Sequence, residues 1–340
     1  MSFPGSSGLP TISSALCWAV SAGCRGCHAR RLQFLAASSP IDQHVKGFFR
    51  SGRRCHSRRC GYINAIVESG PLPPEPTSSL DVVSVGATMN IMMAAALAQG
   101  DTVIENCAKE PQASWIWPTF PELHGRRHPG RRYGYHQDPG RGAAVRRLLP
   151  PSFPTRSEAG TYMAAVAATG GQILVKNIIP KHMDCITAKL QECGVEVEEQ
   201  DDTLLVRRTA RLKKANVKTL PYPGFPTDMQ PQMTTPSSPL AQGTSLVTEG
   251  VWSSRYRYVD ELKRMGARIQ VDDKTAVVEG VEKLTGAPIQ AYDLRAGAAL
   301  VIAALAAEGE SEISNVQYIE RAMRTSSASL RALSAGHPAP

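Results

Sequence analysis

The sequence predicts an α/β protein of two domains, in which repeated units of helix–strand–helix–strand–strand enclose helices within small sheets. The first observation is the length of 340 residues, which suggests about two domains, each large enough for its own core. The second is an internal repeat, in which an Ala-rich helix ends at a glycine and a short strand follows. The third is that this pattern recurs roughly every seventy residues.

The first half of each copy is a helix followed by a strand. The glycines that end the helices are Gly100, Gly171, Gly243 and Gly309. The apolar runs before them predict helices over 89–100, 161–171, 239–243 and 298–309. The strands predicted after them cover 101–106, 172–177, 244–249 and 310–315. Each strand ends six residues after its glycine, at an Asn in three copies and at Glu249 in the third copy.

The second half of copies two and three is a further helix and a hairpin. The helices are predicted over 183–194 and 259–266, and the hairpins over 195–207 and 267–280. A glycine ends each helix as a C-terminal cap, and an Asp-Asp pair suits each hairpin turn. A remnant of another unit lies at 41–48 and 61–65, and copy one lacks its second half. The first domain is therefore predicted to be incomplete, and the ligand site to lie in a cleft between the two domains.

The excess of positive over negative charge in the chain lies in two patches. The whole chain carries +8, whereas residues 21–60 carry +8 and residues 111–156 carry +6. The remainder therefore carries −6, so a polyanion such as nucleic acid is not the expected partner. The run of Arg, Gly and Pro from Arg126 to Arg132 has neither a helical nor a strand period, which leaves a basic arm or a disordered insertion as interpretations.

The cysteines and the N-terminus suggest no cofactor and no export. Cys24-Arg25-Gly26-Cys27-His28 matches a haem-attachment pattern, but no basic region precedes the apolar run over 15–22, so we expect no secretory signal. Cys24 and Cys27 with Cys55 and Cys60 form a weak zinc candidate, because no strand signal supports the second pair. No window is long and apolar enough for a membrane span, and a cytoplasmic protein with free thiols is expected.

The run over 221–230, Pro-Tyr-Pro-Gly-Phe-Pro-Thr-Asp-Met-Gln, is the most distinctive. Three prolines and a glycine fix an irregular backbone that ends in the carboxylate of Asp228. Such a carboxylate suits a general base, and an equally good interpretation is the N-cap of the next helix. Ser84-Val85-Gly86 precedes an apolar helix. Backbone N–H groups at such a helix start are able to hold a phosphate. The alternative interpretation is that Ser84 is an ordinary N-cap of the helix. The arginines that suggest an anionic substrate are Arg255, Arg295 and Arg321.

Long motifs in this chain closely resemble the bacterial UDP-N-acetylglucosamine 1-carboxyvinyltransferase family of enolpyruvyl transferases. They are PYPGFPTDMQPQ, SVGATMNIMMAAALAQGDTVIEN, SEAGTYM, RYVDELKRMGA, DLRAGAALVIAALAAEG and YIER. The resemblance covers about 39–49, 61–66, 80–111, 156–232 and 240–321. It implies a two-domain inside-out α/β barrel, with domains at 1–155 and 156–330. It also implies transfer of enolpyruvyl from phosphoenolpyruvate to the 3′-hydroxyl of UDP-N-acetylglucosamine, which is the first committed step of peptidoglycan precursor synthesis.

The same resemblance implies roles for individual residues. Asp228 would contact the sugar and act as the base for its hydroxyl. Arg295 and Arg321 would neutralise phosphoenolpyruvate, with Arg321 also counted as catalytic and Arg255 on the same side. The residues implied to hold the UDP-sugar are Pro40, Ile41, Asp42, Ser84, Val85, Gly86 and Val251. No metal or cofactor is implied.

The chain also departs from the family. The N-terminal Lys-Asn pair has no counterpart, and residues 31–39 lack the Cys or Asp that donates a proton to phosphoenolpyruvate. Stretches of alien composition replace family segments of similar length at 17–38, 50–60, 112–155 and after Arg321, and prolines 236 and 239 enter the helix after Asp228. We therefore hypothesise paired frame slips and predict little or no turnover. The alternatives are an inactive or unstable remnant and, less favoured by these motifs, the sister 5-enolpyruvylshikimate-3-phosphate synthase.

Overall fold

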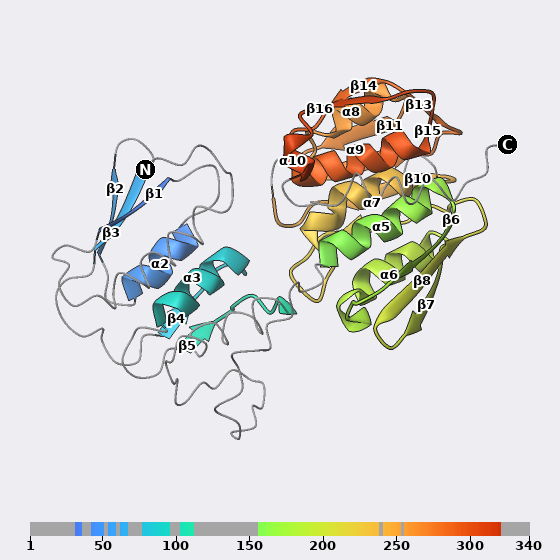
Figure 1. Cartoon of the computed structure of the whole chain (residues 1–340). Helices are drawn as coiled ribbons and strands as arrows, with labels where there is room; N and C mark the ends of the chain where they lie inside the picture. Colours follow the sequence, from blue (N-terminus) through green and yellow to red (C-terminus); the bar gives the residue numbers. More distant parts are fainter. Residues whose placement is uncertain are drawn as a thin grey trace. The chain divides into compact units, whose positions relative to one another are not determined.

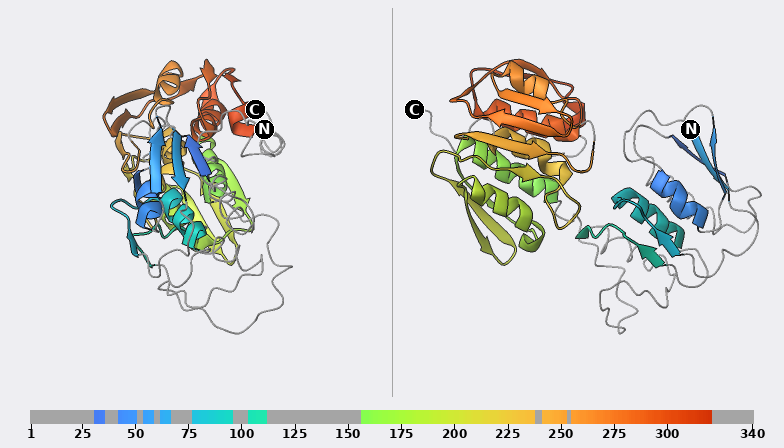
Figure 2. Two further views of the ribbon diagram at one scale, coloured as in Figure 1. Left: turned by 90° about the vertical axis from the view of Figure 1, so that its left-hand side faces the viewer. Right: turned by 180° about the vertical axis from the view of Figure 1, so that it is seen from behind.

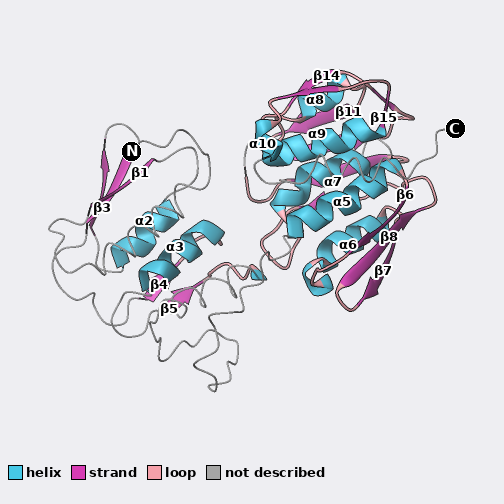
Figure 3. Cartoon of the chain, viewed as in Figure 1, coloured by secondary structure: helices cyan, strands magenta, loops and turns pink. Residues whose placement is uncertain are grey.

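The computed structural model divides the chain into two compact units, Met1–Leu149 and Pro150–Pro340 (Figure 1). The units are described separately below. The structure describes residues 31–35, 42–50, 54–58, 62–66, 77–95, 103–111, 156–237, 241–252 and 255–320. Within these ranges helices and strands alternate along much of the chain (Figure 3).

The first unit pairs two helices with short strands. Helix α2 (Asp42–Arg50) packs beside α3 (Val85–Ala95). The strands of this unit are β1 (Arg31–Leu35), β2 (Arg54–Arg58), β3 (Tyr62–Ile66), β4 (Thr77–Ser79) and β5 (Val103–Glu105). Strand β3 lies between β1 and β2 in an antiparallel sheet, and β4 pairs in parallel with β5. A small apolar cluster of Leu80, Ala87 and Ile91 joins α3 to this parallel pair through Ile104.

The second unit begins with one complete repeat. Its elements are α5 (Arg156–Thr169), β6 (Gly171–Val175), η2 (Pro180–His182), α6 (Asp184–Glu192), β7 (Glu196–Gln200) and β8 (Thr203–Arg208). Strand β8 is central in the antiparallel sheet β6-β8-β7. The elements follow the predicted order of helix, strand, helix and hairpin.

The next repeat carries the PTDMQ motif. Its elements are β9 (Val217–Lys218), η3 (Thr227–Met229), α7 (Gln230–Ser237), β10 (Thr244–Thr248), α8 (Val259–Arg264), β11 (Arg268–Asp272) and β12 (Thr275–Glu279). These strands form one sheet in the order β11-β12-β10-β9, in which only the β9–β10 pair is parallel.

The last repeat is built from short parallel pairs. Its elements are β13 (Leu284–Thr285), β14 (Pro288–Gln290), α9 (Leu294–Ala306), β15 (Ala307–Glu308), β16 (Glu312–Ser314) and α10 (Gln317–Glu320). Strand β13 pairs with β15 and β14 with β16, both across α9 in the sequence. Asp293 caps α9, because its Oδ1 atom accepts hydrogen bonds from the backbone N–H groups of Arg295 and Ala296.

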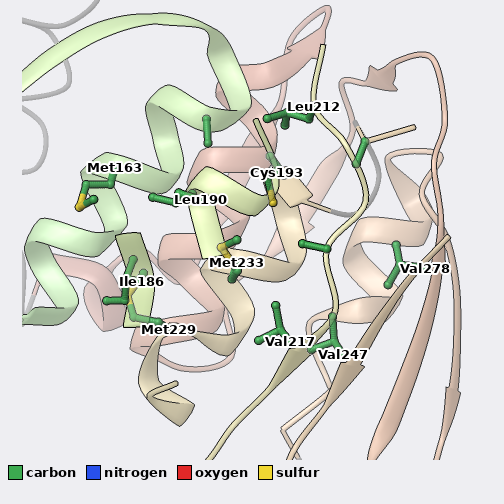
Figure 4. Close-up of a cluster of buried hydrophobic side chains, with 14 of the residues drawn as sticks. Met163, Ile186, Leu190, Cys193, Leu212, Val217, Met229, Met233, Val247 and Val278 are labelled. Atoms are coloured by element: carbon green, nitrogen blue, oxygen red, sulfur yellow. The ribbon is translucent and has the colours of Figure 1, made fainter. Parts of the chain in front are cut away.

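Helices α5, α7 and α9 pack against one another, and the strands of the second unit lie over them in the view from behind (Figure 2). The apolar core runs between these layers, and side chains from helices and strands meet in it (Figure 4). Gly160 of α5 is part of this packing, because a Cβ atom there would lie 2.8 Å from Cε of Met229 and 3.1 Å from Cδ1 of Ile186. This arrangement confirms the predicted α/β class, with helices enclosed by small sheets.

The repeat is visible in the backbone as well as in the sequence. Asn106, Asn177 and Asn315, which end the strands of copies one, two and four, have φ angles of 53°, 57° and 62°. Asn tolerates this left-handed region better than most residues, which explains why it recurs at this position. The predicted glycine caps Gly194 and Gly266 have φ angles of 89° and 92°, so they end α6 and α8 as expected.

Three predictions about local structure are wrong. The helix predicted over 298–309 ends earlier than expected, because α9 ends at Ala306 and β15 follows directly. The third copy forms no helix over 241–243, and α7 covers Gln230–Ser237. Proline 239 lies outside the described residues. Strand β2 forms over Arg54–Arg58, although we expected no strand beside Cys55. Pairing with β3 supplies the hydrogen bonds that the local sequence does not signal.

Candidate active site

The loop before α7 holds Asp228 in a fixed place. The backbone N–H of Leu220 donates to the carbonyl of Phe225 at 3.0 Å, and that of Gly224 donates to the carbonyl of Pro221 at 2.9 Å. A Cβ atom on Gly224 would lie 2.5 Å from the Cβ of Leu220, so only glycine fits this turn. The tight turn leads directly into η3, which contains Asp228.

Two arginines from other parts of the second unit converge on Asp228. Nε of Arg295, in the first turn of α9, donates to Oδ1 of Asp228 at 2.5 Å. Nη1 of Arg255, from the segment before α8, lies 3.6 Å from the same oxygen. Asp228 lies within η3, and its carboxylate is paired with Arg295 and faces Arg255.

These charges keep the carboxylate ionised. Burial is the largest single influence and favours the neutral acid, but Arg295, then Arg255 and Arg156, outweigh it together. The pKa of Asp228 is therefore lowered from its usual value, although the side chain remains 40% exposed. A carboxylate in this state is able to accept a proton or a hydrogen bond from a hydroxyl group.

Arg255 is the more enclosed of the two arginines, with 14% of its side chain exposed. Its Nη1 donates to the carbonyl of Thr227 at 3.4 Å, and its guanidinium carbon lies 5.5 Å from the ring centre of Trp252. Burial, followed by the neighbouring Arg295, lowers the pKa of Arg255, while Asp228 acts in the opposite direction. A guanidinium keeps its charge at any physiological pH, so Arg255 and Arg295 offer two cations at one place.

Sequence reasoning missed two residues of this region. Arg156, at the start of α5, acts electrostatically on Asp228, and its guanidinium carbon lies 5.5 Å from the ring centre of Tyr222. Its position directly before the SEAGTYM motif was the available signal. Glu249 is fully buried and its carboxylate accepts hydrogen bonds from both sides of the site. Its replacement of the repeated Asn was the available signal.

Val251 lies on the same side of the second unit as these groups. Its backbone N–H donates to Oε1 of Glu249 at 2.9 Å, and its side chain is 43% exposed. The chain thus brings together four of the residues singled out in its second half: Asp228, Val251, Arg255 and Arg295. Arg321 lies outside the described residues, since α10 ends the described range at Glu320.

In the first unit, Ser84 caps helix α3. Its Oγ atom accepts from the backbone N–H of Ala87 at 3.3 Å, and its carbonyl accepts from the backbone N–H of Thr88 at 3.0 Å. The interpretation of Ser84 as a helix cap is therefore confirmed. Val85 is exposed and Gly86 half-buried at the same helix start.

Asp42 begins helix α2 and is exposed, whereas Pro40 and Ile41 lie outside the described residues. Helix α2 approaches α3 closely, because a Cβ atom on Gly86 would lie 3.3 Å from Cε1 of His44. His44 is buried, and burial lowers its pKa against the opposing charge of Asp42. Gln43 ties the two segments together, since Oε1 accepts from the backbone N–H of Asp81 at 2.9 Å.

Among the described residues, no group of three or more His, Cys, Asp or Glu side chains is arranged to hold a metal ion. Cys24, Cys27 and Cys60 of the zinc candidate lie outside these ranges, so that candidate is not tested. No helix in the described part of the chain is long and apolar enough to cross a membrane.

Comparison with known proteins places this chain and its fold in a family. The model of the EPSP synthase (3-phosphoshikimate 1-carboxyvinyltransferase) family matches residues 36–120 and 151–327. The chain resembles the crystal structure of the enolpyruvyl transferase NikO from Streptomyces tendae, with a TM-score of 0.70 and 20% identity over 89% of this chain and 72% of that one. EPSP synthase from Acinetobacter baumannii gives a TM-score of 0.58 and 18% identity over 87% and 71%. The chain therefore belongs to the EPSP synthase family and has the enolpyruvyl transferase fold.

The sequence relatives are more specific. UDP-N-acetylglucosamine 1-carboxyvinyltransferase of Clostridium botulinum is 46% identical over 83% of this chain and 66% of its own length. The enzyme of that name numbered 3 from Caldanaerobacter subterraneus is 45% identical over 87% and 69%, and that from Symbiobacterium thermophilum 46% over 87% and 68%. The chain spans about two thirds of the length of these relatives, and its resemblance to this group is confirmed.

Proposed function

We propose that this chain is by family a UDP-N-acetylglucosamine 1-carboxyvinyltransferase, whose reaction transfers enolpyruvyl from phosphoenolpyruvate to the 3′-hydroxyl of the sugar, and that turnover by this particular chain is impaired. The observation that carries the proposal is the convergence of Arg295 and Arg255 on Asp228, in a chain 43–46% identical to relatives of that name. We assign residues 1–155 and 156–330 to the two domains. We also propose that the protein is located in the cytoplasm and that its role is in peptidoglycan precursor synthesis.

The reaction needs a base, a proton donor and cations. The sugar oxygen bonds to C2 of phosphoenolpyruvate while C3 gains a proton, and the double bond returns when phosphate leaves and C3 gives up a proton. Asp228 would accept the proton of the attacking hydroxyl. Arg255 and Arg295, with Arg321, would hold the phosphate and the carboxylate.

The pairing of Asp228 with both arginines suggests how the base becomes active. Phosphoenolpyruvate would compete for the guanidinium groups of Arg255 and Arg295. Weaker pairing raises the pKa of Asp228 from its lowered value, because those charges are what favour the carboxylate. A carboxylate with a higher pKa is a stronger base, so substrate binding would prepare Asp228 to take the hydroxyl proton.

The first unit would supply the nucleotide site. Ser84, Val85 and Gly86 stand at the N-terminus of α3, where backbone N–H groups and the helix dipole favour a phosphate. Pro40, Ile41 and Asp42 would lie at the uracil, and Val251 would contact the nucleotide sugar. UDP-N-acetylglucosamine and phosphoenolpyruvate are thus the proposed small-molecule partners.

The test is phosphate release by the full chain from these two substrates. We expect binding of UDP-N-acetylglucosamine but little or no turnover, because 31–39 holds no Cys or Asp to protonate C3. A normal rate of phosphate release would contradict this impairment, and failure to bind UDP-N-acetylglucosamine would contradict the substrate. An intact relative, such as the Clostridium botulinum enzyme, serves as the positive control.

A further inference from the structure

Glu249 breaks the internal repeat at one defined position. Copies one, two and four have Asn106, Asn177 and Asn315 there, each with a positive φ angle, whereas Glu249 is not among the positive-φ residues. The left-handed backbone that selects Asn is therefore absent from the third copy. At this position of the repeat the third copy has Glu249, whose side chain is longer than that of Asn and carries a negative charge.

The carboxylate of Glu249 is fully buried and well supplied with hydrogen-bond donors. Its Oε1 atom accepts from Oγ1 of Thr219 at 2.7 Å and from the backbone N–H groups of Val251 at 2.9 Å and Trp252 at 3.2 Å. Oγ1 of Thr227 lies 3.0 Å from Oε1 and 2.9 Å from Oε2. These partners come from three separate stretches of the chain.

A buried carboxylate is costly unless such bonds compensate it, and bonds to a charged acceptor are stronger than neutral ones. Glu249 therefore holds its partners firmly. Thr227 directly precedes Asp228, while Val251 and Trp252 form the neighbouring loop, whose indole faces Arg255. One carboxylate thus joins the loop of Asp228 to the loop that precedes Arg255.

We propose that Glu249 is a positioning residue that sets the spacing between these two loops and so shapes the site for the sugar of the acceptor. This inference rests on the proposed function for the identity of the acceptor, but the connection between the loops does not depend on it. Glu249 contacts the loops and not the reacting atoms, so it acts through Thr227, Val251 and Trp252.

The connection is tested by hydrogen–deuterium exchange of backbone amides in the full chain. In Glu249→Ala, exchange at Val251 and Trp252 rises about tenfold or more, since each lost bond to a buried charge is worth about 1.5–3 kcal/mol. In Glu249→Gln it stays within about threefold, because the amide oxygen still accepts both backbone bonds and its NH2 group donates to Thr227. Unchanged exchange at these amides in Glu249→Ala overturns the proposal.

Glu261 provides a matched control. It is also a buried glutamate, and its carboxylate accepts from the backbone N–H of Gln290 at 3.1 Å and from the hydroxyl of Tyr292 at 2.9 Å. Glu261→Ala removes a comparable set of bonds elsewhere, so exchange at Val251 and Trp252 is unchanged. A rise at those amides equal to that in Glu249→Ala would mean general destabilisation and would overturn the proposal.

The effect on the site is measured as the Kd for UDP-N-acetylglucosamine. Glu249→Ala weakens binding about tenfold or more and Glu249→Gln restores it to within about threefold, as expected for loss of one or two hydrogen-bonded supports. Equal weakening in both variants overturns the positioning role. If the wild-type chain does not bind this ligand, the proposed function fails, and the exchange experiment alone still decides the role of Glu249.

Thr227→Val serves if Glu249→Ala does not fold. It removes the hydroxyl that joins the Asp228 loop to the carboxylate and leaves the bonds to Val251 and Trp252 in place. Exchange then rises only in the Asp228 loop, by about tenfold. Equal exchange in wild type and Thr227→Val overturns the proposal.

Discussion

Nε of Arg295 lies 2.5 Å from Oδ1 of Asp228, although the two residues are 67 positions apart in the sequence. Asp228 stands before α7 and Arg295 in the first turn of α9, two helices that pack side by side. The packing of the central helices thus assembles the charged pair.

Asp228→Asn should reduce stability in a pH-dependent way. A carboxyl group whose pKa is lowered by folding adds stability above its unfolded pKa, and that contribution is lost as the pH falls through the folded value. The difference in free energy of unfolding between wild type and Asp228→Asn is therefore largest at neutral pH and shrinks below the usual Asp pKa of 3.8. Urea unfolding at several pH values measures it, and a difference independent of pH would contradict the lowered pKa.

Arg295→Ala should weaken the binding of phosphoenolpyruvate by about tenfold to a hundredfold, because a charge-assisted hydrogen bond contributes about 1.5–3 kcal/mol. Arg295→Lys retains the charge but not the planar fork, so it restores only part of the affinity. Calorimetric titration gives the Kd. Arg207→Ala is the control, since Arg207 forms an ion pair with Glu196 on the sheet β6-β8-β7, and affinity lost equally there would contradict a specific role.

Tyr258→Phe should lower the free energy of unfolding by about 1–3 kcal/mol, because it removes two buried hydrogen bonds. The hydroxyl of Tyr258 accepts from Nε2 of Gln230 at 3.0 Å and donates to Oγ1 of Thr234 at 2.9 Å. Both partners lie in α7, so the bonds join α7 to the start of α8. Urea unfolding of Tyr258→Phe is compared with that of Tyr318→Phe, whose ring is 45% exposed and whose effect should be small.

Asn177→Val should cost about 1–3 kcal/mol, because a β-branched residue is strained at a φ angle of 57°. Asn177→Gly should be close to neutral, since glycine adopts this backbone freely. Thermal unfolding distinguishes the two variants. Lys176→Val is the control, because Lys176 is one residue earlier and does not have a positive φ angle. An equal loss of stability in Lys176→Val and Asn177→Val would argue against backbone strain at Asn177.

The repeat explains how much of this structure could be predicted. Regular apolar spacing and glycine caps are local signals, so α5, α6, α8 and α9 and both hairpins of the second unit were found from the sequence. Strand β2 was not found, since its pairing with β3 depends on context, and the helix predicted over 241–243 does not form. Residue patterns and the family resemblance both indicated Asp228 and Arg295 as candidates, but their contact comes from helix packing that no local pattern encodes.

Glu249 and Arg156 show the same limit at the site. Each contributes through neighbours distant in sequence, Thr219 and Thr227 in one case and Asp228 in the other. Repeat patterns indicate residues that recur, whereas Glu249 is distinguished by differing from Asn106, Asn177 and Asn315 at the same position. The departure from the repeat at Glu249 is therefore itself the sequence signal of its role.

Among the described residues, the apolar core around α5, α7 and α9 is contributed by side chains of the second unit. Within those residues, helices and strands of the second unit complete this interior. Mutational decay in the first half of the gene would therefore leave the scaffold around Asp228 intact.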